Sequence, residues 1–287
     1  MRSLKHFSRR KCQALVKIVA VMIMAVSSFG VSSNAQKASW EELNSQAKTL
    51  YEKKRYSEAE QVAKEALQVA ENSFGLDHPN VAIVLGNLGA IFGEQRNYAK
   101  AETMYQRALV ILEKALGPDD LSVGIMMNGL ATTYGSYGNY AKAEPLYKRT
   151  LAILEKTLGP DHPHVGTCLA SLGRIYQEQG RYAEAAALNE RALPILEKTY
   201  GPDSQKVGDL VGALGAEYEA QGKYAEAESA YRREQTIYEK ILGPDNPTFA
   251  NGLEGQAKFL RKIGKTEEAV ALEVRAKAIR ARPQTSQ

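Results

Sequence analysis

The side chains best suited by type to bind a metal ion are two histidines close to a carboxylate. His162 and His164 flank Pro163 and directly follow Asp161. The proline directs the two imidazoles apart, and no further histidine or cysteine lies near them in the pattern to complete the four ligands of a typical zinc site. The same Asp-His-Pro sequence occurs at residues 77–79. This recurrence favours a role in starting a helix, and no metal ligand is predicted.

Glutamates that could serve acid–base chemistry recur along the chain at Glu102, Glu144 and Glu228. Paired catalytic carboxylates meet in one cleft, whereas these are spread along the chain, and their simplest interpretation is a solvated helix face with nearby lysines. The chain also lacks the Gly-x-Ser-x-Gly and His-Glu-x-x-His motifs of hydrolases. We therefore predict that the protein is not an enzyme and has no catalytic residue and no cofactor.

Glycine, proline and aspartate recur together with a period of 42 residues. The sequence Leu116-Gly117-Pro118-Asp119 returns at 158–161, at 242–245 and, with tyrosine in first place, at 200–203. A second series keeps the same step: Tyr56, Tyr98, Tyr140, Tyr182 and Tyr224. None of these glycines leads to the Lys and Ser or Thr of a phosphate-binding loop. Two markers that share one period indicate structural repeats, separated by the Gly-Pro-Asp element.

Within one repeat the apolar residues have helical spacing. Two groups have steps of 4, 3 and 4 residues: Val81, Leu85, Leu88 and Phe92, then Ala101, Tyr105, Ala108 and Leu112. Such steps place side chains on one face of a helix. Between the groups, residues 95–97 form a polar turn in which Asn97 is suited to cap the second helix. Each repeat is therefore predicted to be two antiparallel helices.

The Gly-Pro-Asp element predicts how one repeat is joined to the next. Gly117 is expected to end a helix in the left-handed conformation, and Pro118 cannot continue that helix. Asp119 is expected to accept hydrogen bonds from the free amides of the next helix. Two further prolines, Pro145 and Pro194, fall inside predicted second helices and are expected to bend them.

Neither helix of a repeat can bury its apolar stripe alone, so neighbouring repeats must stack on one another. The predicted fold is all-α, with about six helix pairs at residues 39–78, 79–120, 121–162, 163–204, 205–246 and 247–282, and a disordered tail at 283–287. The end repeats differ, as terminal units should. Gln256 replaces a leucine of the inner repeats, and Gln46 takes an apolar position in the first helix, 40–53. The closing helix, 266–282, is rich in Lys and Arg and ends before Pro283.

The first 35 residues predict an export signal. They contain six basic and no acidic residues, an apolar run from Ile18 to Val26, and the small-x-small sequence ending in Ala35, after which cleavage is expected. Even the stretch from Ile18 to Val31 would span roughly 21 Å as a helix, short of the roughly 30 Å hydrocarbon core. Cleavage is therefore favoured over a retained membrane anchor, and the protein is expected to be periplasmic or secreted, with no stable membrane span.

Removal of this leader changes the charge and leaves a single cysteine. The remaining chain has 31 basic and 33 acidic residues, a net charge of about −2. Such interspersed charge provides no basic patch for nucleic acid. Cys12 leaves with the leader, so Cys168 has no partner for an internal disulfide. Its apolar helical surroundings favour a small core residue over a reactive thiol or a bond between chains.

The repeat resembles the tetratricopeptide pattern. The residues that carry the resemblance are Leu88, Gly89, Phe92, Ala101, Tyr105 and Ala108. The 42-residue period and the Gly-Pro-Asp-His-Pro sequence at 159–163 resemble the subtype found in kinesin light chains. The resemblance extends over residues 39–282 and implies a right-handed α-α superhelix. In that family the first helices of successive pairs line a concave groove, in which a peptide segment docks.

The resemblance also implies candidate groove residues. Family members often bind through asparagines of a Leu-Asn-Asn-Leu-Ala stretch, which Asn87 and Asn128 match in part. The complete set of candidates on this helix face is Asn44, Lys48, Asn87, Asn128, Ser171, Arg174 and Lys258. The same face carries many small residues: Gly86, Gly129, Ala170, Gly212, Ala213 and Gly255. They favour equally a shallow floor for a partner's backbone and close packing between first helices.

These observations predict an exported scaffold that binds a peptide or protein segment in its concave groove. One alternative is a structural or assembly subunit of an envelope complex, acting through its convex face or through self-association into a homo-oligomer. Another is a regulatory partner of a separately encoded enzyme. A fold of this kind is compatible with many unrelated partners, so the partner is predicted only as a protein or peptide, with no nucleic acid.

Overall fold

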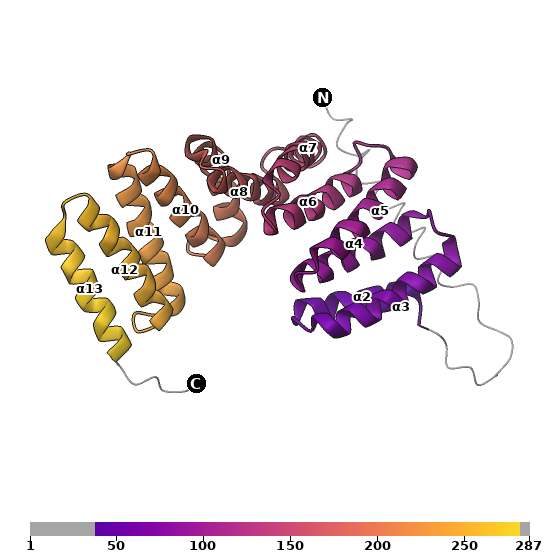
Figure 1. Cartoon of the computed structure of the whole chain (residues 1–287), viewed down its shortest axis with the longest axis horizontal. Helices are drawn as coiled ribbons and strands as arrows, with labels where there is room; N and C mark the ends of the chain where they lie inside the picture. The colour runs from indigo at the N-terminus through magenta and orange to yellow at the C-terminus, as the bar shows by residue number, and fades with distance from the viewer. Residues whose placement is uncertain (1–37, 282–287) are drawn as a thin grey trace, which may run out of the picture. The chain divides into compact units, whose positions relative to one another are not determined.

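The computed structural model describes residues 38–281, and every regular element in this range is an α-helix (Figure 1). The first helices of successive pairs are α2 (Trp40–Glu52), α4 (Pro79–Glu94), α6 (Leu121–Ser136), α8 (Pro163–Glu178), α10 (Gln205–Ala220) and α12 (Pro247–Lys262). The second helices are α3 (Tyr56–Phe74), α5 (Tyr98–Leu116), α7 (Tyr140–Leu158), α9 (Tyr182–Tyr200), α11 (Tyr224–Leu242) and α13 (Thr266–Ala281). The predicted leader lies outside the described residues.

The helices form six pairs that stack in chain order from α2 to α13 (Figure 1). Each first helix packs on its own second helix, and each second helix packs on the first helix of the next pair. The backbones of neighbouring first helices also approach one another closely from α2 to α10, whereas neighbouring second helices lie further apart. Ion pairs of long side chains join the second helices, such as Arg107 with Glu71 at 2.7 Å and Arg149 with Glu113 at 3.1 Å. The first helices therefore form the inner side of the stack. These contacts confirm the predicted all-α solenoid of about six helix pairs.

The turn inside each pair follows the sequence prediction. Asn97 precedes α5, and its side chain accepts a hydrogen bond from the backbone N–H of Lys100 at 3.4 Å. Asn139 caps α7 in the same way, through the N–H of Lys142 at 3.3 Å. Because a capping side chain satisfies an amide that has no partner within the helix, these residues fix where each second helix begins. The predicted capping role of Asn97 is confirmed.

The glycine that ends each second helix adopts a different conformation from the one predicted. Gly117 has φ +90° and ψ 161°, and its N–H bonds the carbonyl of Glu113. This is the extended region at positive φ, essentially open to glycine alone, and not the left-handed helical region. The chain consequently leaves α5 in an extended direction, as Pro118 requires of the residue before it.

The prediction that Asp119 caps the next helix is wrong. The capping residue is Asp120, whose side chain accepts from the N–H of Ser122 at 2.7 Å. Since α6 begins at Leu121, Asp119 lies one residue too early to reach the free amides, and it forms an ion pair with Lys156 at 3.1 Å. Equivalent ion pairs join Lys114 to Asp77 and Lys240 to Asp203. The aspartate of the joint therefore connects adjacent pairs through the second helices.

Histidine occupies the same capping position before α8. Nδ1 of His162 accepts a hydrogen bond from the N–H of His164 at 3.2 Å, and Pro163 occupies the first helical position. His78 caps α4 through the N–H of Asn80 at 3.1 Å. This confirms the predicted role of these histidines in starting a helix. No group of three or more potential metal ligands is found among the described residues.

The core runs continuously between the pairs. Tyr147, the largest of the fully buried side chains, lies between α6 and α8, and its hydroxyl is 2.9 Å from Oγ1 of Thr132. Cys168 is buried beside it, with Sγ 3.6 Å from the carbonyl oxygen of Tyr147. Burial raises the pKa of the Cys168 thiol to about 12, which keeps it protonated and unreactive. The prediction of Cys168 as a small core residue is confirmed.

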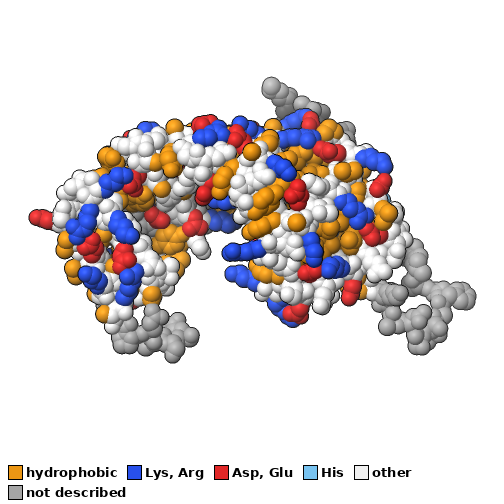
Figure 2. Space-filling model, in the orientation of Figure 1, with side chains coloured by type: hydrophobic (Ala, Val, Ile, Leu, Met, Phe, Trp, Pro, Cys, Tyr) orange, Lys and Arg blue, Asp and Glu red, His pale blue; other side chains and the backbone are white. Residues whose placement is uncertain are grey.

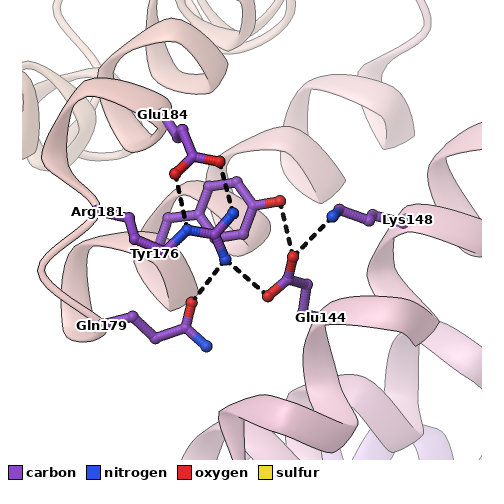
Figure 3. Close-up of polar contacts among 6 residues, drawn as sticks. All are labelled: Glu144, Lys148, Tyr176, Gln179, Arg181 and Glu184. Carbon is purple, nitrogen blue, oxygen red and sulfur yellow. Dashed lines mark hydrogen bonds and ion pairs between the residues drawn. The ribbon is translucent and has the colours of Figure 1, made fainter.

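The periodic glutamates do more than form a solvated helix face. Glu144 on α7 accepts hydrogen bonds from Lys148 one turn away and, across the joint, from the hydroxyl of Tyr176 at 3.1 Å and from Arg181 at 2.8 Å (Figure 3). Arg181 also binds Glu184 and stacks on the Tyr176 ring, 3.7 Å from its centroid. These hydrogen bonds and ion pairs hold the third helix pair against the fourth.

The other periodic glutamates make comparable contacts with the next pair. Glu102 on α5 accepts from the hydroxyls of Tyr134 at 2.7 Å and Tyr137 at 3.2 Å. Glu228 on α11 binds Lys265 at 2.6 Å. The interpretation as a solvated face was therefore wrong in its main point: these carboxylates bond adjacent repeats to each other, and most of their side-chain surface is covered.

Candidate functional site

The cavities of the inner side lie along one stripe of the first helices. The second, third and fourth pairs each contribute two lining residues, three positions apart, and the fifth and sixth pairs contribute one each: Asn87 and Ala90, Gly129 and Thr132, Ser171 and Arg174, then Ala213, then Gly255. Because residues three apart lie on one face of a helix, these positions form a continuous surface from α4 to α12. We call this surface the first-helix face.

The candidates on the first two pairs come together. Nδ2 of Asn87 donates a hydrogen bond to Oδ1 of Asn44 at 2.7 Å, which joins α4 to α2. Lys48 is exposed and, with Asn87, lines a cavity of about 170 Å³ that also contains Tyr51. Each asparagine side chain has two donors and one acceptor oxygen. The mutual bond therefore leaves the Oδ1 of Asn87 and several amide hydrogens available to a ligand.

The glycines of the first-helix face are closely approached by side chains. A Cβ on Gly86 would meet Met126 at 2.6 Å, and one on Gly129 would meet the Tyr105 ring at 2.5 Å. A Cβ on Gly212 would meet the Glu234 carboxylate at 2.3 Å. In these repeats the small residues make room for side chains of neighbouring helices. This supports close packing between helices rather than a shallow surface for a partner's backbone. Gly255 is the exception, because no side chain of residues 38–281 other than those of its chain neighbours lies within 4 Å of its Cβ position.

Arg174 and Ser171 line a second cavity, of about 310 Å³, between α8 and α10. Lys206 and Asp209 lie on its other side. Arg174 is exposed and makes no hydrogen bond or ion pair within residues 38–281, whereas Arg181 and Arg191 on the neighbouring helix are both paired. Lys206 lies 3.9 Å above the ring centroid of Tyr200. The cavity therefore presents a guanidinium whose five donors are unused by the described residues.

Two candidates stand apart from these clusters. The Asn128 side chain is half-buried on α6 and makes no hydrogen bond within the described part. The backbone carbonyl oxygen of Asn128 accepts a hydrogen bond from the Thr132 hydroxyl. Lys258 is exposed on α12 and lines none of the cavities described above. The structure therefore groups Asn44, Lys48 and Asn87 at one site and Ser171 and Arg174 at another.

Sequence reasoning missed a buried polar pair below the Arg174 cavity. Nδ2 of Asn189 on α9 donates to Oε1 of Glu217 on α10 at 2.7 Å, and both side chains are fully buried. Burial, with a contribution from the charge of Glu190, raises the pKa of Glu217 to about 7. A comparison of equivalent positions in the 42-residue repeats would have indicated this pair. Tyr105, Tyr147 and Tyr231 occupy the position of Asn189, and Ile91, Thr133, Ile175 and Phe259 occupy that of Glu217.

Charge on the molecule is mixed in sign. Figure 2 shows Lys and Arg side chains interspersed with Asp and Glu over the visible face, with apolar side chains between them. Ion pairs account for most of the arginines in residues 38–281. No described helix is long and apolar enough to cross a bilayer. On the first-helix face, Arg174 and Lys48 are basic side chains that form no ion pair with the described residues.

Comparison with protein families identifies the repeat. A model described as tetratricopeptide repeat matches residues 42–114, 86–156 and 122–198, and a second model of the same description matches residues 212–248. Together these matches include well over half of the chain. A comparison with curated proteins found no match.

Solved structures share the fold. One contains nearly identical tetratricopeptide-like repeats assigned to a kinesin light chain of Podosopora anserina, at 25% identity and a TM-score of 0.64, covering 73% of this chain and 99% of the other. BtubC (BKLC) from P. vanneervenii is 20% identical, with a TM-score of 0.64 and coverage of 88% and 97%. A Rap protein complexed with competence and sporulation factor is 16% identical, with a TM-score of 0.57 and coverage of 84% and 74%. The last two identities support similarity of fold alone.

Proposed function

Since the chain belongs to the tetratricopeptide repeat family, we propose that it is a non-enzymatic scaffold that binds a peptide or protein segment along its first-helix face. The observation that carries this proposal is the unpaired Arg174 guanidinium beside Ser171 in an open cavity of that face. Helix pairs that stack into an elongated surface are suited to an extended partner. The similarity to the Rap protein complex, in which a related fold holds another factor, supports the same function.

The available groups favour a partner segment rich in hydrogen-bond acceptors. Lys48 and Arg174 contribute charged donors, and Asn87 and Asn128 contribute amides, at intervals along α2, α4, α6 and α8. Backbone carbonyls of an extended peptide, together with a carboxylate near Arg174, would match them. Such a function needs neither a cofactor nor a catalytic residue.

A triple substitution tests the use of this face. Replacing Asn87, Asn128 and Arg174 by alanine should weaken capture of the native partner at least tenfold, because three sets of donors are lost without disturbing the core. The measurement is affinity capture from the native extract followed by mass spectrometry, then titration of the captured segment against each variant. Asn72→Ala with Arg96→Ala is the matched control, since both residues are exposed and lie outside the first-helix face.

Unchanged capture by the triple variant would exclude the first-helix face as the working surface. If the protein instead elutes as a discrete oligomer with no other partner, the evidence would favour a structural or assembly role through the other faces. Binding that falls to the same degree in the control variant would indicate a general effect of charge rather than a specific site.

We also propose that the protein is exported, as its basic and apolar leader predicts. Production of the full chain in a bacterial host should then yield a product that begins at Gln36 and appears in the periplasm or the medium. N-terminal sequencing and fractionation measure this directly. An intact product that remains with the cells would contradict the proposal, and an intact product in the membrane fraction would indicate a retained anchor.

A further inference from the structure

The joint between the fifth and sixth helix pairs is more open than the others. From α2 to α10 the backbone of each first helix closely approaches the next, but α10 and α12 lie further apart and are joined by the long side chain of Lys262, which pairs with Glu219 at 2.8 Å. A cavity of about 510 Å³ lies at this joint, between α11 and α12. Its volume is within the range of roughly 300–1,000 Å³ that small-molecule sites occupy. Gly255, on the first-helix face, lies at its edge.

The cavity is encoded by departures from the 42-residue repeat. Five of its lining positions, Glu234, Gln235, Tyr238, Gly252 and Gln256, differ from the residues found 42, 84, 126 and 168 positions earlier. On α11, Glu234 replaces Ala66, Ala108, Thr150 and Ala192, Gln235 replaces Leu67, Leu109, Leu151 and Leu193, and Tyr238 replaces Ala70, Leu112, Leu154 and Leu196. On α12, Gly252 replaces Val84, Met126, Cys168 and Leu210, and Gln256 replaces Leu88, Leu130, Leu172 and Leu214. Four of these changes introduce a polar or ionisable side chain, and the fifth removes a side chain altogether. Apart from its chain neighbours and the backbone of its own helix, no described atom lies within 4 Å of the Cβ position of Gly252.

These departures are not explained by a solvent-facing end of the solenoid. The sequence interpretation treated Gln256 as a feature of a terminal repeat, yet the residue is buried, with 8% of its surface exposed, and lines the cavity. Its Oε1 atom has no hydrogen-bond partner among residues 38–281. A buried acceptor without a partner costs free energy, and a terminal cap would instead expose its polar group to water. This amide oxygen therefore points to a ligand that supplies a donor.

The second polar group is a carboxyl without a partner. Glu234 makes no hydrogen bond or ion pair within the described residues, and the only charged group that lines the cavity is its own carboxyl. Arg275, which lies 5.1 Å from the centroid of the Phe249 ring, is already paired with Glu239. No basic side chain of the described part neutralises Glu234.

The remaining walls are aromatic and aliphatic. Tyr231 and Tyr238 donate their hydroxyl protons to Glu219 and Asp209, so their rings rather than their hydroxyls are available to a ligand. Phe249, Ile241 and Leu242 complete the lining. A carboxylate and a free amide oxygen beside several aromatic rings match a positively charged nitrogen on an apolar stem, because ring faces and anionic oxygens both attract cations.

We propose that the cavity between α11 and α12 binds an organic cation with an apolar body, with Glu234 and Gln256 accepting hydrogen bonds from its nitrogen. Lysine and arginine side chains of a partner and free alkylamines share this chemistry. The site is distinct from the Asn87 and Arg174 clusters and does not require the proposed partner segment to bind there.

The test uses 4-phenylbutylammonium as the probe and the full chain, with affinity measured by ligand-observed saturation-transfer NMR. Burial and the charge of Asp209 raise the pKa of Glu234 to about 7, and alkylammonium groups titrate near pH 10.4. At about pH 8.5 both partners therefore carry charge. We expect the probe to bind at least tenfold more tightly than the neutral 4-phenylbutanol. Equal affinity for the two compounds would overturn the proposal.

Restoring the repeat residue should close the site. Gly252→Leu introduces the side chain that Leu210 has in the preceding repeat, and it should reduce probe affinity at least tenfold while the melting temperature is maintained. Gly93→Leu on α4 is the matched control, because it also replaces a helix glycine with free space around its Cβ and should leave affinity within twofold. If Gly252→Leu fails to fold, Gln256→Leu and Glu234→Gln provide the same test. Binding that survives these changes would overturn the proposal.

A second pair of probes distinguishes a basic side chain of a partner from a free alkylamine as the bound cation. An acetylated and amidated Ala-Lys-Ala peptide is compared with the same peptide containing norleucine. Preference for lysine in this pair assigns the site to a basic side chain of a partner, and binding of the free amine alone assigns it to small amines. Failure of both the amine and the lysine peptide to bind would overturn the proposal, whether or not the triple variant of the first-helix face loses its partner.

Discussion

Replacing Tyr147 by alanine is expected to lower the free energy of unfolding by about 3–5 kcal/mol, the range for removing a large aromatic side chain from a core. Tyr147 has no exposed surface and lies at the centre of the joint between the third and fourth pairs. The loss should be large because the side chain is fully buried and because each pair in a solenoid depends on its neighbours. Urea unfolding followed by circular dichroism measures the change.

Tyr147→Phe separates packing from hydrogen bonding. It keeps the ring and removes only the hydroxyl that lies 2.9 Å from Oγ1 of Thr132. The expected loss is about 1 kcal/mol, the usual contribution of one hydrogen bond. If the alanine variant is no less stable than the phenylalanine variant, packing of the Tyr147 ring does not stabilise the joint between the third and fourth pairs.

The sequence predicts the helices and the core because both depend on local spacing. Steps of 3 and 4 residues identify the buried faces, and the 42-residue period repeats that information along the chain. The cap by Asn97 depends on residues three positions apart, and the burial of Cys168 depends on its place in an apolar stripe. Each of these properties can be determined within one helix pair.

The features that were missed depend on contacts between pairs. Glu144 has an adjacent lysine that the sequence makes obvious, but Tyr176 and Arg181 lie 32 and 37 residues away and reach it only after stacking. The unpaired state of Arg174 likewise depends on which carboxylates the neighbouring helix presents. Comparing the repeats with one another, rather than with a general pattern, would have identified Asn189 and Glu217, since both replace residues of different polarity at a fixed register.

Replacing Glu217 by glutamine is expected to stabilise the protein at neutral and alkaline pH. Asn189 already donates to Oε1 of Glu217, while Oδ1 of Asn189 and Oε2 of Glu217 are buried acceptors that receive no hydrogen bond from the part of the chain that the structure describes. A proton on Glu217 supplies the missing donor, which agrees in direction with its raised pKa. The amide group of glutamine supplies such donors at every pH. It also removes a buried charge that has no basic partner.

The pH dependence provides the sharper test. The pKa of Glu217 is about 7 when folded and close to its ordinary value of 4.5 when unfolded. Between these values the unfolded chain has released the proton and the folded protein has not, so stability falls as pH rises through this interval and is constant above it. Glu217→Gln removes this contribution and should raise the free energy of unfolding at pH 8 by on the order of 2 kcal/mol, with little effect at pH 4.

The difference in free energy of unfolding between wild type and variant reports on Glu217 alone. Glu234 also has a raised pKa, but it is present in both proteins and its contribution cancels. Glu184→Gln is the control, since that carboxylate is about half exposed and ion-paired on the surface, where a substitution changes stability little. A Glu217→Gln variant that is less stable than wild type at pH 8 would mean that the ionised carboxylate is held by a partner. The buried pair would then contribute to stability as an ion rather than as a protonated acid.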